Sequence, residues 1–250
     1  MNDSTPVQDA ILLVAGTGTR LRPLTDTQPK CLLEVGGQSL LLRLLRQLGA
    51  LGIERVVLAT GYLSSTLADA VEGVEGLPEI VFAHNADYQT TNNAESLKIA
   101  MPAVEGRAFL LCDGDVLLRE AGWLGELVRE PRENVLSMIA REDLGEEEMK
   151  IKLVDGAVAG LSKKLAPQAS HGESLGLQKL GVSIAADLSA RLAAMSEAER
   201  ATSYYEDIFA ELIVGGHTFH TLSVPIDTWT EIDTIEDLEA ARALFLRWSC

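Results

Sequence analysis

Cysteine is scarce in this chain, and its positions follow no pattern. The 250 residues include three cysteines, Cys31, Cys112 and Cys250. An odd number without regular spacing argues against a disulfide framework and against a zinc site built from cysteine. We therefore expect reduced thiols, as in the cytoplasm.

Basic residues are also few, and long apolar runs are missing. Lys and Arg number 21 against 37 Asp and Glu, which gives a formal net charge of -16. Such a surface repels nucleic acids and anionic lipids, so we expect neither as a partner. No apolar run reaches about 18 residues, and the polar segment Met1–Asp9 has no basic stretch followed by an apolar one. The sequence thus predicts no membrane span, no signal peptide and a cytoplasmic location.

Apolar residues make up 47% of the chain, enough for a sizeable core. In the first half, short apolar runs alternate with helical patterns, which predicts an α/β fold with a mostly parallel sheet covered on both faces. The predicted strands are Ala10–Ala15, Arg55–Thr60, Ile80–His84 and Phe109–Cys112. The predicted helices are Ser39–Leu48, Ser65–Val74 and one starting at Asn92, with Glu95 as its capping-box partner.

The pattern changes after about residue 134, where antiparallel strands are expected. Asp155-Gly156 between two apolar runs is a strong hairpin signal. The expected elements are strands at Val135–Ala140, Met149–Val154, Ala157–Ser162, Leu177–Ala185 and His217–Val224, and helices at Ser203–Val214 and Thr234–Trp248. No linker composition separates the halves, so we predict one domain over 8–249, with halves 8–133 and 134–249 and a mixed sheet.

A glycine-rich loop follows the first predicted strand. It reads Gly16-Thr17-Gly18-Thr19-Arg20-Leu21-Arg22-Pro23-Leu24-Thr25, with Pro29-Lys30 after it. Such a loop lets backbone N–H groups approach phosphate oxygens, and Arg20 and Lys30 add cations. The dinucleotide fingerprint would need glycine at position 21, and the P-loop would need Gly-Lys-Ser/Thr, which is absent. The loop predicts a phosphate cradle of another kind; an ordinary strand-to-helix turn is the alternative.

This loop resembles the signature of the sugar-phosphate nucleotidyltransferase superfamily, which implies a Rossmann-like three-layer α/β/α nucleotidyltransferase fold. Three further segments are similar to the branch that includes phosphocholine cytidylyltransferases, to which aminoethylphosphonate and inositol-phosphate enzymes are related. They are Thr60-Gly61-Tyr62, Tyr88-Gln89-Thr90-Thr91-Asn92-Asn93-Ala94-Glu95-Ser96-Leu97 and Glu231-Ile232-Asp233-Thr234-Ile235-Glu236-Asp237-Leu238.

The resemblance implies transfer of CMP from CTP to a small phosphorylated or phosphonate head group, of the phosphocholine or 2-aminoethylphosphonate type, with release of pyrophosphate. The second half would bind the acceptor. A sugar-1-phosphate or inositol phosphate as acceptor is one alternative, and a non-catalytic nucleotide-binding regulatory module is another. The enzyme is favoured because Arg20, Lys30, Asp115 and Asp233 are all present, whereas a degenerate module would be expected to have lost at least one.

Magnesium would be held by Asp115 and Asp233, again by resemblance. Asp115 follows a buried strand, where α/β sheets place ligand sites. Asp233 precedes a predicted helix and could instead be its N-cap. Arg20 would hold the leaving phosphates, Lys30 the α-phosphate and Lys163 the acceptor phosphate, although the adjacent Lys164 leaves the register open. No general base is needed, because the second pKa of a phosphate is about 6.

The remaining site residues also come from the resemblance. Helix capping is the alternative for Asn92, Asn93 and Ser96, and a simple turn is the alternative for Gly61. Core packing is the alternative for the aromatic residues, of which the chain has only 12 (Trp 3, Tyr 4, Phe 5). A solvated hairpin end is the alternative for Lys163 and Lys164. The implied nucleotide-binding residues are Leu13, Ala15, Gly16, Thr17, Gly18, Thr19, Thr60, Gly61, Asn85, Asn92, Asn93 and Ser96. At the acceptor site the resemblance implies Gly176, and the aromatic faces and carboxylates that a cationic head group would call for are offered by Tyr204, Glu206, Trp229 and Glu231. The final helix, with Leu244, Phe245 and Trp248, could pack on its own domain or on a partner, as in a homodimer.

Overall fold

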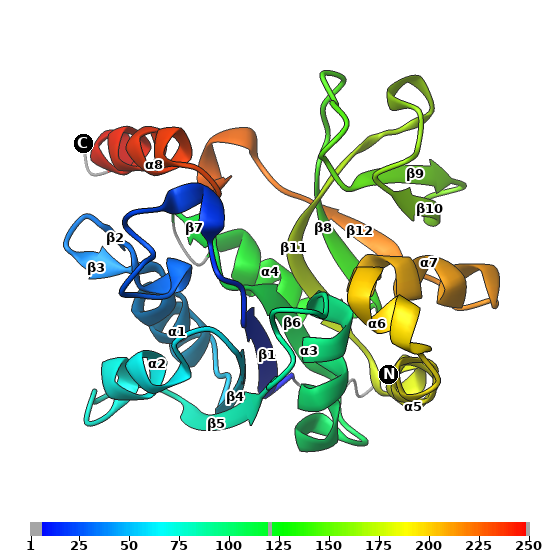
Figure 1. Ribbon diagram of the computed structural model, residues 1–250. Helices are drawn as coiled ribbons and strands as arrows, with labels where there is room; N and C mark the ends of the chain where they lie inside the picture. Colours follow the sequence, from blue (N-terminus) through cyan, green and yellow to red (C-terminus); the bar gives the residue numbers. More distant parts are fainter. Residues whose placement is uncertain (1–6, 120–121, 249–250) are drawn as a thin grey trace.

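A computed structural model describes residues 7–119 and 122–248, so Cys250 and the last residue of the predicted domain lie outside the described residues. Its centre is a nine-stranded sheet with the order β10-β9-β11-β6-β1-β4-β5, to which β8 is added beside β11 and β12 beside β8 (Figure 1). The strands are β1 Asp9–Val14, β4 Arg55–Thr60, β5 Glu79–His84, β6 Phe109–Asp113, β8 Val135–Ile139, β9 Lys150–Val154, β10 Ala157–Ser162, β11 Gly172–Leu180 and β12 His220–Ser223.

The sheet is mixed and mostly parallel in the first half, as the sequence predicts. β1 runs parallel to β4 and β6, and β4 runs parallel to β5. The second half adds the antiparallel strands β9, β10 and β11, and the predicted hairpin joins β9 to β10. β11 of the second half pairs with β6 of the first half as well as with β8 and β9, so it joins the two halves in one sheet.

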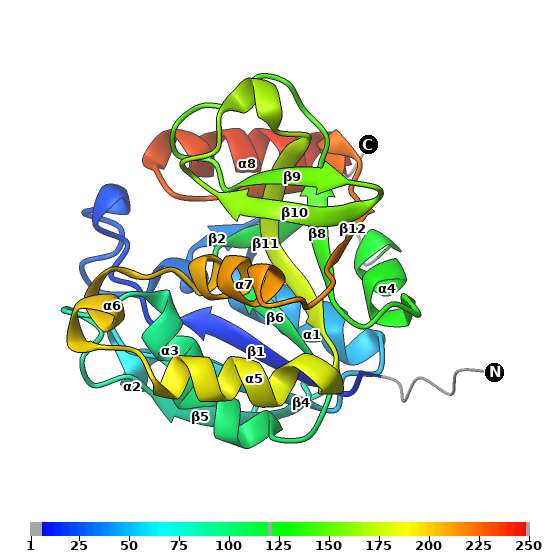
Figure 2. The ribbon, with the colours of Figure 1, turned by 90° about the vertical axis from the view of Figure 1, so that its right-hand side faces the viewer.

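Helices cover both faces of the sheet because successive side chains of each buried strand point to opposite sides. In β1, Ala10 and Leu12 belong to one core cluster and Ile11 to another. α1 Leu40–Ala50, α2 Ser64–Val71 and α4 Gly122–Arg129 pack on the first face. α3 Asn93–Ala100, α5 Val182–Ala193 and α7 Tyr205–Val214 pack on the second. Figure 2 shows α5, α7 and the short α6 Glu197–Thr202 on the near side of the sheet.

The last helix, α8 Ile235–Trp248, closes a third and smaller core. Its Leu238 is buried, and Phe245 and Trp248 pack against the same cluster. The helix therefore packs on its own domain. None of the helices in the described ranges combines the length and apolar character that crossing a bilayer would require.

Two local predictions are wrong. The predicted strand Leu177–Ala185 is a strand only to Leu180, because Ile184, Leu188 and Leu192 recur at helical spacing and are buried as part of α5. The predicted capping box at α3 is also absent. The side chain of Asn92 accepts a hydrogen bond from the Asn93 backbone N–H, while Glu95 pairs with cationic side chains.

Candidate active site

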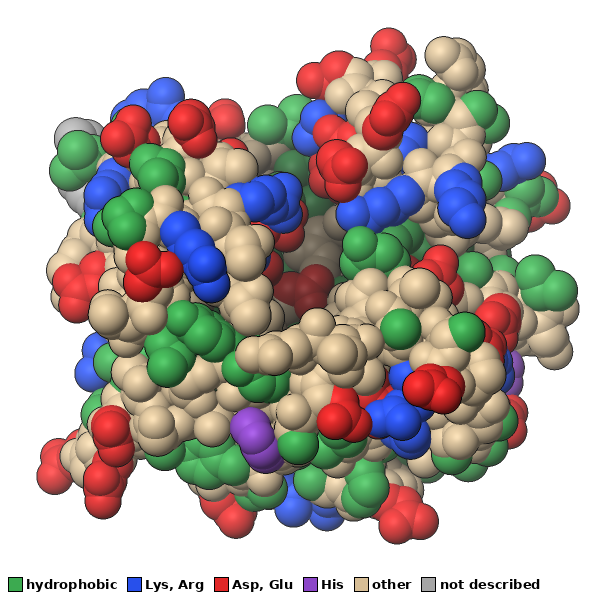
Figure 3. All heavy atoms as spheres, viewed as in Figure 1, with side chains coloured by type: hydrophobic (Ala, Val, Ile, Leu, Met, Phe, Trp, Pro, Cys, Tyr) green, Lys and Arg blue, Asp and Glu red, His purple; other side chains and the backbone are tan. Residues whose placement is uncertain are grey.

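A cleft of about 640 Å³ opens at the carboxyl ends of β1 and β6, where α/β sheets place ligand sites. Figure 3 shows the molecule hollowed between the lobe of α8 and the lobe of β9 and β10, with acidic side chains on the floor and basic ones on both rims. Residues of both halves line the cleft, so the site is built by the whole fold rather than by one motif.

The glycine loop forms one wall. It contains two 3-10 turns, η1 Thr19–Leu21 and η2 Lys30–Leu32. Gly18 has a φ of 60°, and a Cβ there would lie 3.1 Å from Thr25 Cγ2 and 3.2 Å from Lys30 Cβ. The Thr25 hydroxyl donates to the Gly18 carbonyl at 2.7 Å. The loop is thus folded tightly on itself, which leaves Gly16, Gly18 and Arg20 facing the cleft.

Lys30 lies between the two aspartates named as metal ligands. Its Nζ is 2.6 Å from Asp115 Oδ2 and 2.6 Å from Asp233 Oδ1. Arg20 Nη2 is 2.8 Å from Asp233 Oδ2. Although burial alone would lower the pKa of Lys30, the two carboxylates raise it above its ordinary value. Burial alone would raise the pKa of Asp233, but Lys30 and Arg20 lower it. Both groups are therefore charged at neutral pH.

Two short strands bring a third carboxylate to this point. β13 Trp229–Glu231 pairs with β7 Val116–Leu118, and the Ile232 backbone N–H donates to the Asp115 carbonyl at 3.0 Å. As a result, ligand oxygens of Asp115, Glu231 and Asp233 lie within 4.8 Å of one another. Solvent reaches Glu231, yet the surrounding protein atoms and the two other carboxylates raise its pKa to about 8.

This cluster fits a hard divalent cation. All three groups are carboxylates, the ligands that Mg²⁺ prefers. Asp115 Oδ1 is buried and accepts no hydrogen bond, although a buried polar atom is normally paired. An oxygen without a partner beside two other carboxylates therefore fits the role of a metal ligand.

The structure brings seven of the twelve sequence-predicted nucleotide residues to the cleft: Leu13, Ala15, Gly16, Gly18, Asn92, Asn93 and Ser96. The other five are not among its lining residues: Thr17, Thr19, Thr60, Gly61 and Asn85. Asn85 is 1% exposed, and its amide group donates to Ser96 Oγ and Thr91 Oγ1 at 3.1 and 3.0 Å. It holds the loop that leads to the lining residues.

The predicted acceptor residues are divided in the same way. Gly176, Tyr204, Glu206 and the predicted catalytic Lys163 line the cleft, and Glu231 joins the carboxylate cluster. Trp229 is not among the lining residues and packs against the first core instead. The Lys163 Nζ lies 4.9 Å from the Tyr204 ring centroid and 3.4 Å from Glu147 Oε2.

The end of the cleft that holds the predicted acceptor residues is acidic. Glu206 is 6% exposed, its Oε2 has no hydrogen-bond partner, and burial raises its pKa to about 7. Burial also raises the pKa of Glu173. Several lining residues were not predicted from the sequence: Tyr88, Thr91, Glu147, Glu148, Glu173 and Ser174. Tyr88 and Thr91 lie inside a segment already singled out, but the glutamates reach the cleft only through the β8–β9 connection and β11.

Gly176 marks a close approach in the floor of the cleft. Its φ is 71°, and a Cβ there would collide with the carboxylate of Asp113. That carboxylate accepts a hydrogen bond from the Tyr205 hydroxyl at 3.0 Å, and Gln178 donates to the same hydroxyl at 3.0 Å. Burial raises the pKa of Asp113 well above its ordinary value. Glycine is therefore required where β11 passes β6.

A glycine loop and a carboxylate cluster at the carboxyl ends of a Rossmann-like sheet are the features of a nucleotidyltransferase. Residues 10–211 match the model of the MobA-like NTP transferase domain family, so the chain belongs to that family.

Two sequence relatives concern phosphonates. The chain is 32% identical to the 2-aminoethylphosphonate cytidylyltransferase of Lancefieldella rimae over 112 residues, which is 45% of this chain and 44% of that protein. It is 28% identical to the CMP-5'-(3-aminopropyl)phosphonate synthase of Streptomyces rubellomurinus in an alignment of 256 positions that covers 96% of this chain and 39% of that protein. The matches thus span less than half of the length of either relative.

Solved structures confirm the predicted fold class. The CTP:phosphocholine cytidylyltransferase of Streptococcus pneumoniae superposes with a TM-score of 0.79 at 21% identity, covering 96% of this chain and 99% of that one. The inositol-1-phosphate CTP transferase of T. maritima superposes with a TM-score of 0.80 at 23% identity, covering 98% of both chains.

Proposed function

We propose that this protein is a magnesium-dependent cytidylyltransferase that transfers CMP from CTP to a small phosphonate or phosphate carrying an amino group. The observation that carries the proposal is the cluster of Asp115, Glu231 and Asp233 opposite the glycine loop, with Lys30 and Arg20 between them. This arrangement supplies cations for a triphosphate and hard ligands for one divalent ion in a single cleft.

The reaction follows from these groups. An oxygen of the acceptor forms a bond to the α-phosphorus of CTP, and the bond from that phosphorus to the bridging oxygen breaks, which releases pyrophosphate. Gly16 and Gly18 leave room for the triphosphate, Arg20 holds its departing phosphates, and Lys30 stabilises negative charge at the α-phosphate. The second pKa of a phosphate is about 6, so the attacking oxygen needs no general base.

Asp115 and Asp233 would hold the metal, with Glu231 as a third carboxylate. When bound, Mg²⁺ would neutralise charge on the phosphate oxygens. Lys30 lies 2.6 Å from each of the two aspartates and keeps their carboxylates together.

The acidic end of the cleft supports an amine as the acceptor's head group. Glu206 offers a buried carboxylate oxygen without a partner, and Glu173 and Glu147 lie in the same wall. A quaternary ammonium would call for several aromatic faces, whereas the cleft lining holds two tyrosines, Tyr88 and Tyr204. The names of the two phosphonate relatives also support a primary amine. A sugar phosphate offers no positive charge to these glutamates.

Pyrophosphate release tests the proposal. The enzyme is incubated with each of the four nucleoside triphosphates, MgCl₂ and, in turn, 2-aminoethylphosphonate, phosphocholine, glucose 1-phosphate and inositol 1-phosphate. We expect turnover with CTP and the aminophosphonate, and none after removal of divalent ions with EDTA. Turnover with a sugar phosphate but not with the amines would refute the acceptor class.

The same panel separates an enzyme from a regulatory module. Nucleotide binding by calorimetry without pyrophosphate from any pair would show that the chain binds nucleotide but does not transfer it.

We place the enzyme in the cytoplasm, where CTP is made.

A further inference from the structure

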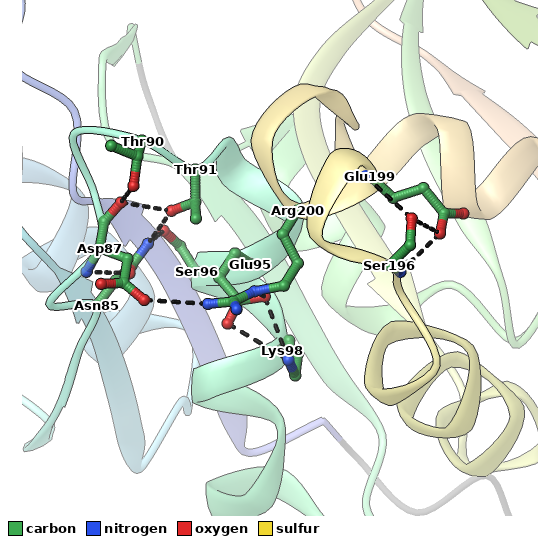
Figure 4. A network of polar contacts seen from close by, with 10 residues as sticks. All are labelled: Asn85, Asp87, Thr90, Thr91, Glu95, Ser96, Lys98, Ser196, Glu199 and Arg200. Carbon is green, nitrogen blue, oxygen red and sulfur yellow. Dashed lines mark hydrogen bonds and ion pairs between the residues drawn. The ribbon is translucent and has the colours of Figure 1, made fainter.

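Arg200 of α6 joins the two walls of the cleft. Its Nη2 lies 3.0 Å from Asp87 Oδ2, and its Nε lies 3.0 Å from Glu95 Oε2 (Figure 4). Both carboxylates belong to the first half of the chain, in the segment that leads into and through the start of α3. Arg200 itself belongs to the second half, a few residues before the acceptor residues Tyr204 and Glu206. The ion pairs therefore connect segments more than 100 residues apart in sequence, since the Arg200–Asp87 separation is 113.

The first-half partners of Arg200 are themselves held in place by further contacts. Glu95 is 3% exposed and is also paired with Lys98 at 3.3 Å. The backbone carbonyl of Asp87 accepts the hydroxyl hydrogen bonds of Thr90 and Thr91 at 3.2 and 2.9 Å. Figure 4 shows these threonines and the Arg200 side chain gathered around Asp87. Through Asp87, Arg200 can therefore set the position of the Asp87–Asn93 loop, which leads to the cleft-lining Asn92 and Asn93.

Backbone contacts continue the connection into the second wall. The Asn92 N–H donates to the Arg200 carbonyl at 2.8 Å, and the Asn92 side chain donates to the Thr202 carbonyl at 3.2 Å. The Tyr205 N–H donates to Asn93 Oδ1 at 2.9 Å, at the first turn of α7. Asn92 and Asn93 line the cleft among the predicted nucleotide residues. They therefore also hold the backbone of α6 and of the start of α7, which carries the predicted acceptor residues.

We propose that Arg200 is a positioning residue that couples the two substrate sites, so that nucleotide binding strengthens acceptor binding and the reverse. The inference rests on the proposed function. Arg200 is not among the cleft-lining residues and acts through Asp87 and Glu95. A nucleotide that orders the Asp87–Asn93 loop also fixes α6 and the start of α7, and an acceptor then meets Tyr204 and Glu206 already in place.

The test measures coupling rather than activity. Calorimetry gives the Kd of 2-aminoethylphosphonate with and without a non-hydrolysable CTP analogue and MgCl₂, and the Kd of the analogue with and without the aminophosphonate. By linkage the two ratios must agree. We expect a ratio of about five or more for the natural chain, below about two for Arg200→Ala, and an intermediate value for Arg200→Lys, which can keep only one of the two ion pairs.

Arg191→Ala is the matched control. Arg191 also pairs with two carboxylates, Glu199 of α6 and Glu211 of α7, but both lie in the second half. Its loss loosens α6 without cutting the connection to Asp87 and Glu95, so the coupling ratio should stay within about twofold of the natural value. An equal loss of coupling in both alanine variants would overturn the proposal, as would full coupling in Arg200→Ala.

Thermal unfolding shows whether each variant is folded, because an unfolded variant would lose coupling for an unrelated reason. If Arg200→Ala does not fold, Arg200→Lys and Glu95→Gln decide, because the glutamine keeps the shape of the side chain and removes its charge. Turnover by the natural chain without any coupling contradicts this inference alone, whereas absence of turnover contradicts the proposed function as well.

Discussion

The two ends of the cleft balance charge in opposite ways. At the nucleotide end each cation has a carboxylate partner, with Lys30 between Asp115 and Asp233 and Arg20 on Asp233. At the acceptor end carboxylates outnumber cations, and the buried Glu206 Oε2 has no partner. The first end thus pairs each of these cations with a carboxylate, whereas the second leaves a buried carboxylate oxygen unpaired.

Under the proposed function, this difference lets an acidic protein bind two anionic substrates side by side. The triphosphate would be bound by cations that already have carboxylate partners. The acceptor would meet negative charge that a positively charged head group neutralises, and its phosphate would meet Lys163. Each end would therefore select for a different charge pattern, and substitutions can disturb one end at a time.

Removing a carboxylate at the nucleotide end should have the largest effect. Asp115→Asn keeps the shape of the side chain but takes a negative charge from the metal cluster and leaves Lys30 with one partner. We expect kcat/KM in pyrophosphate release to fall by about 10²- to 10³-fold. Asp26→Asn is the control, because Asp26 pairs with Arg22 in the same loop and both side chains are exposed. An unchanged rate for Asp115→Asn would exclude it as a metal ligand.

Removing the cation at the acceptor end comes next. Lys163→Ala should raise the KM for the acceptor by roughly 10-fold, the value of one charge-assisted contact, and should leave the KM for CTP nearly unchanged. Lys164→Ala settles the register, because Lys164 is adjacent but is not among the cleft-lining residues. Equal effects of both variants would mean that neither lysine meets the phosphate specifically.

A side chain at Gly176 should narrow the acceptor end. Gly176→Ala combines a left-handed backbone with a collision against Asp113, whereas Gly156→Ala has a similar φ of 79° and nothing within 4 Å of the added carbon. The left-handed backbone conformation costs about 1 kcal/mol of folding stability for alanine at either position. Thermal unfolding should therefore show a larger loss for Gly176→Ala, together with a raised KM for the acceptor that Gly156→Ala lacks.

The smallest effect is expected from Glu206→Gln, which should change how the melting temperature depends on pH. The pKa of Glu206 is raised from 4.5 to about 7, so the folded state favours the protonated form. That stabilising contribution is complete below the ordinary pKa and is lost as pH rises through 7. Glu206→Gln should therefore raise Tm at pH 8 by a few degrees and leave it unchanged near pH 4.

The same variant should bind the acceptor more weakly. In the natural chain the KM for the aminophosphonate should fall between pH 6 and pH 8 as Glu206 ionises. Part of this fall reflects ionisation of the phosphonate, which Glu206→Gln retains. A KM profile identical in the two proteins would show that Glu206 does not meet the amine.

The sequence predicted what short-range patterns control. The apolar runs of β1, β4 and β6 and the Asp155-Gly156 hairpin are local signals, and each was found where expected. The pairing of Asp115 with Asp233 came only from family resemblance, because 118 positions separate them and the β7–β13 ladder that joins them consists of two three-residue strands.

The predictions that failed also have physical causes. The boundary between β11 and α5 was missed because a buried strand and a buried helix start have the same apolar composition, and the polar residues Glu173 and Ser174 hid the first half of the strand. The partners of Arg200 were not visible either, since Asp87 and Glu95 lie more than 100 positions away in the sequence.

β11 has a consequence for how the chain can be divided. Its nine residues are all buried, and it exchanges backbone hydrogen bonds with β6 of the first half and with β8 and β9 of the second. A cut near residue 133 would leave β6 with an open edge in one fragment and an exposed nine-residue strand in the other, and such edges aggregate. We therefore expect each fragment to be insoluble when expressed alone. Activity should return only when the two fragments are expressed together and reassemble.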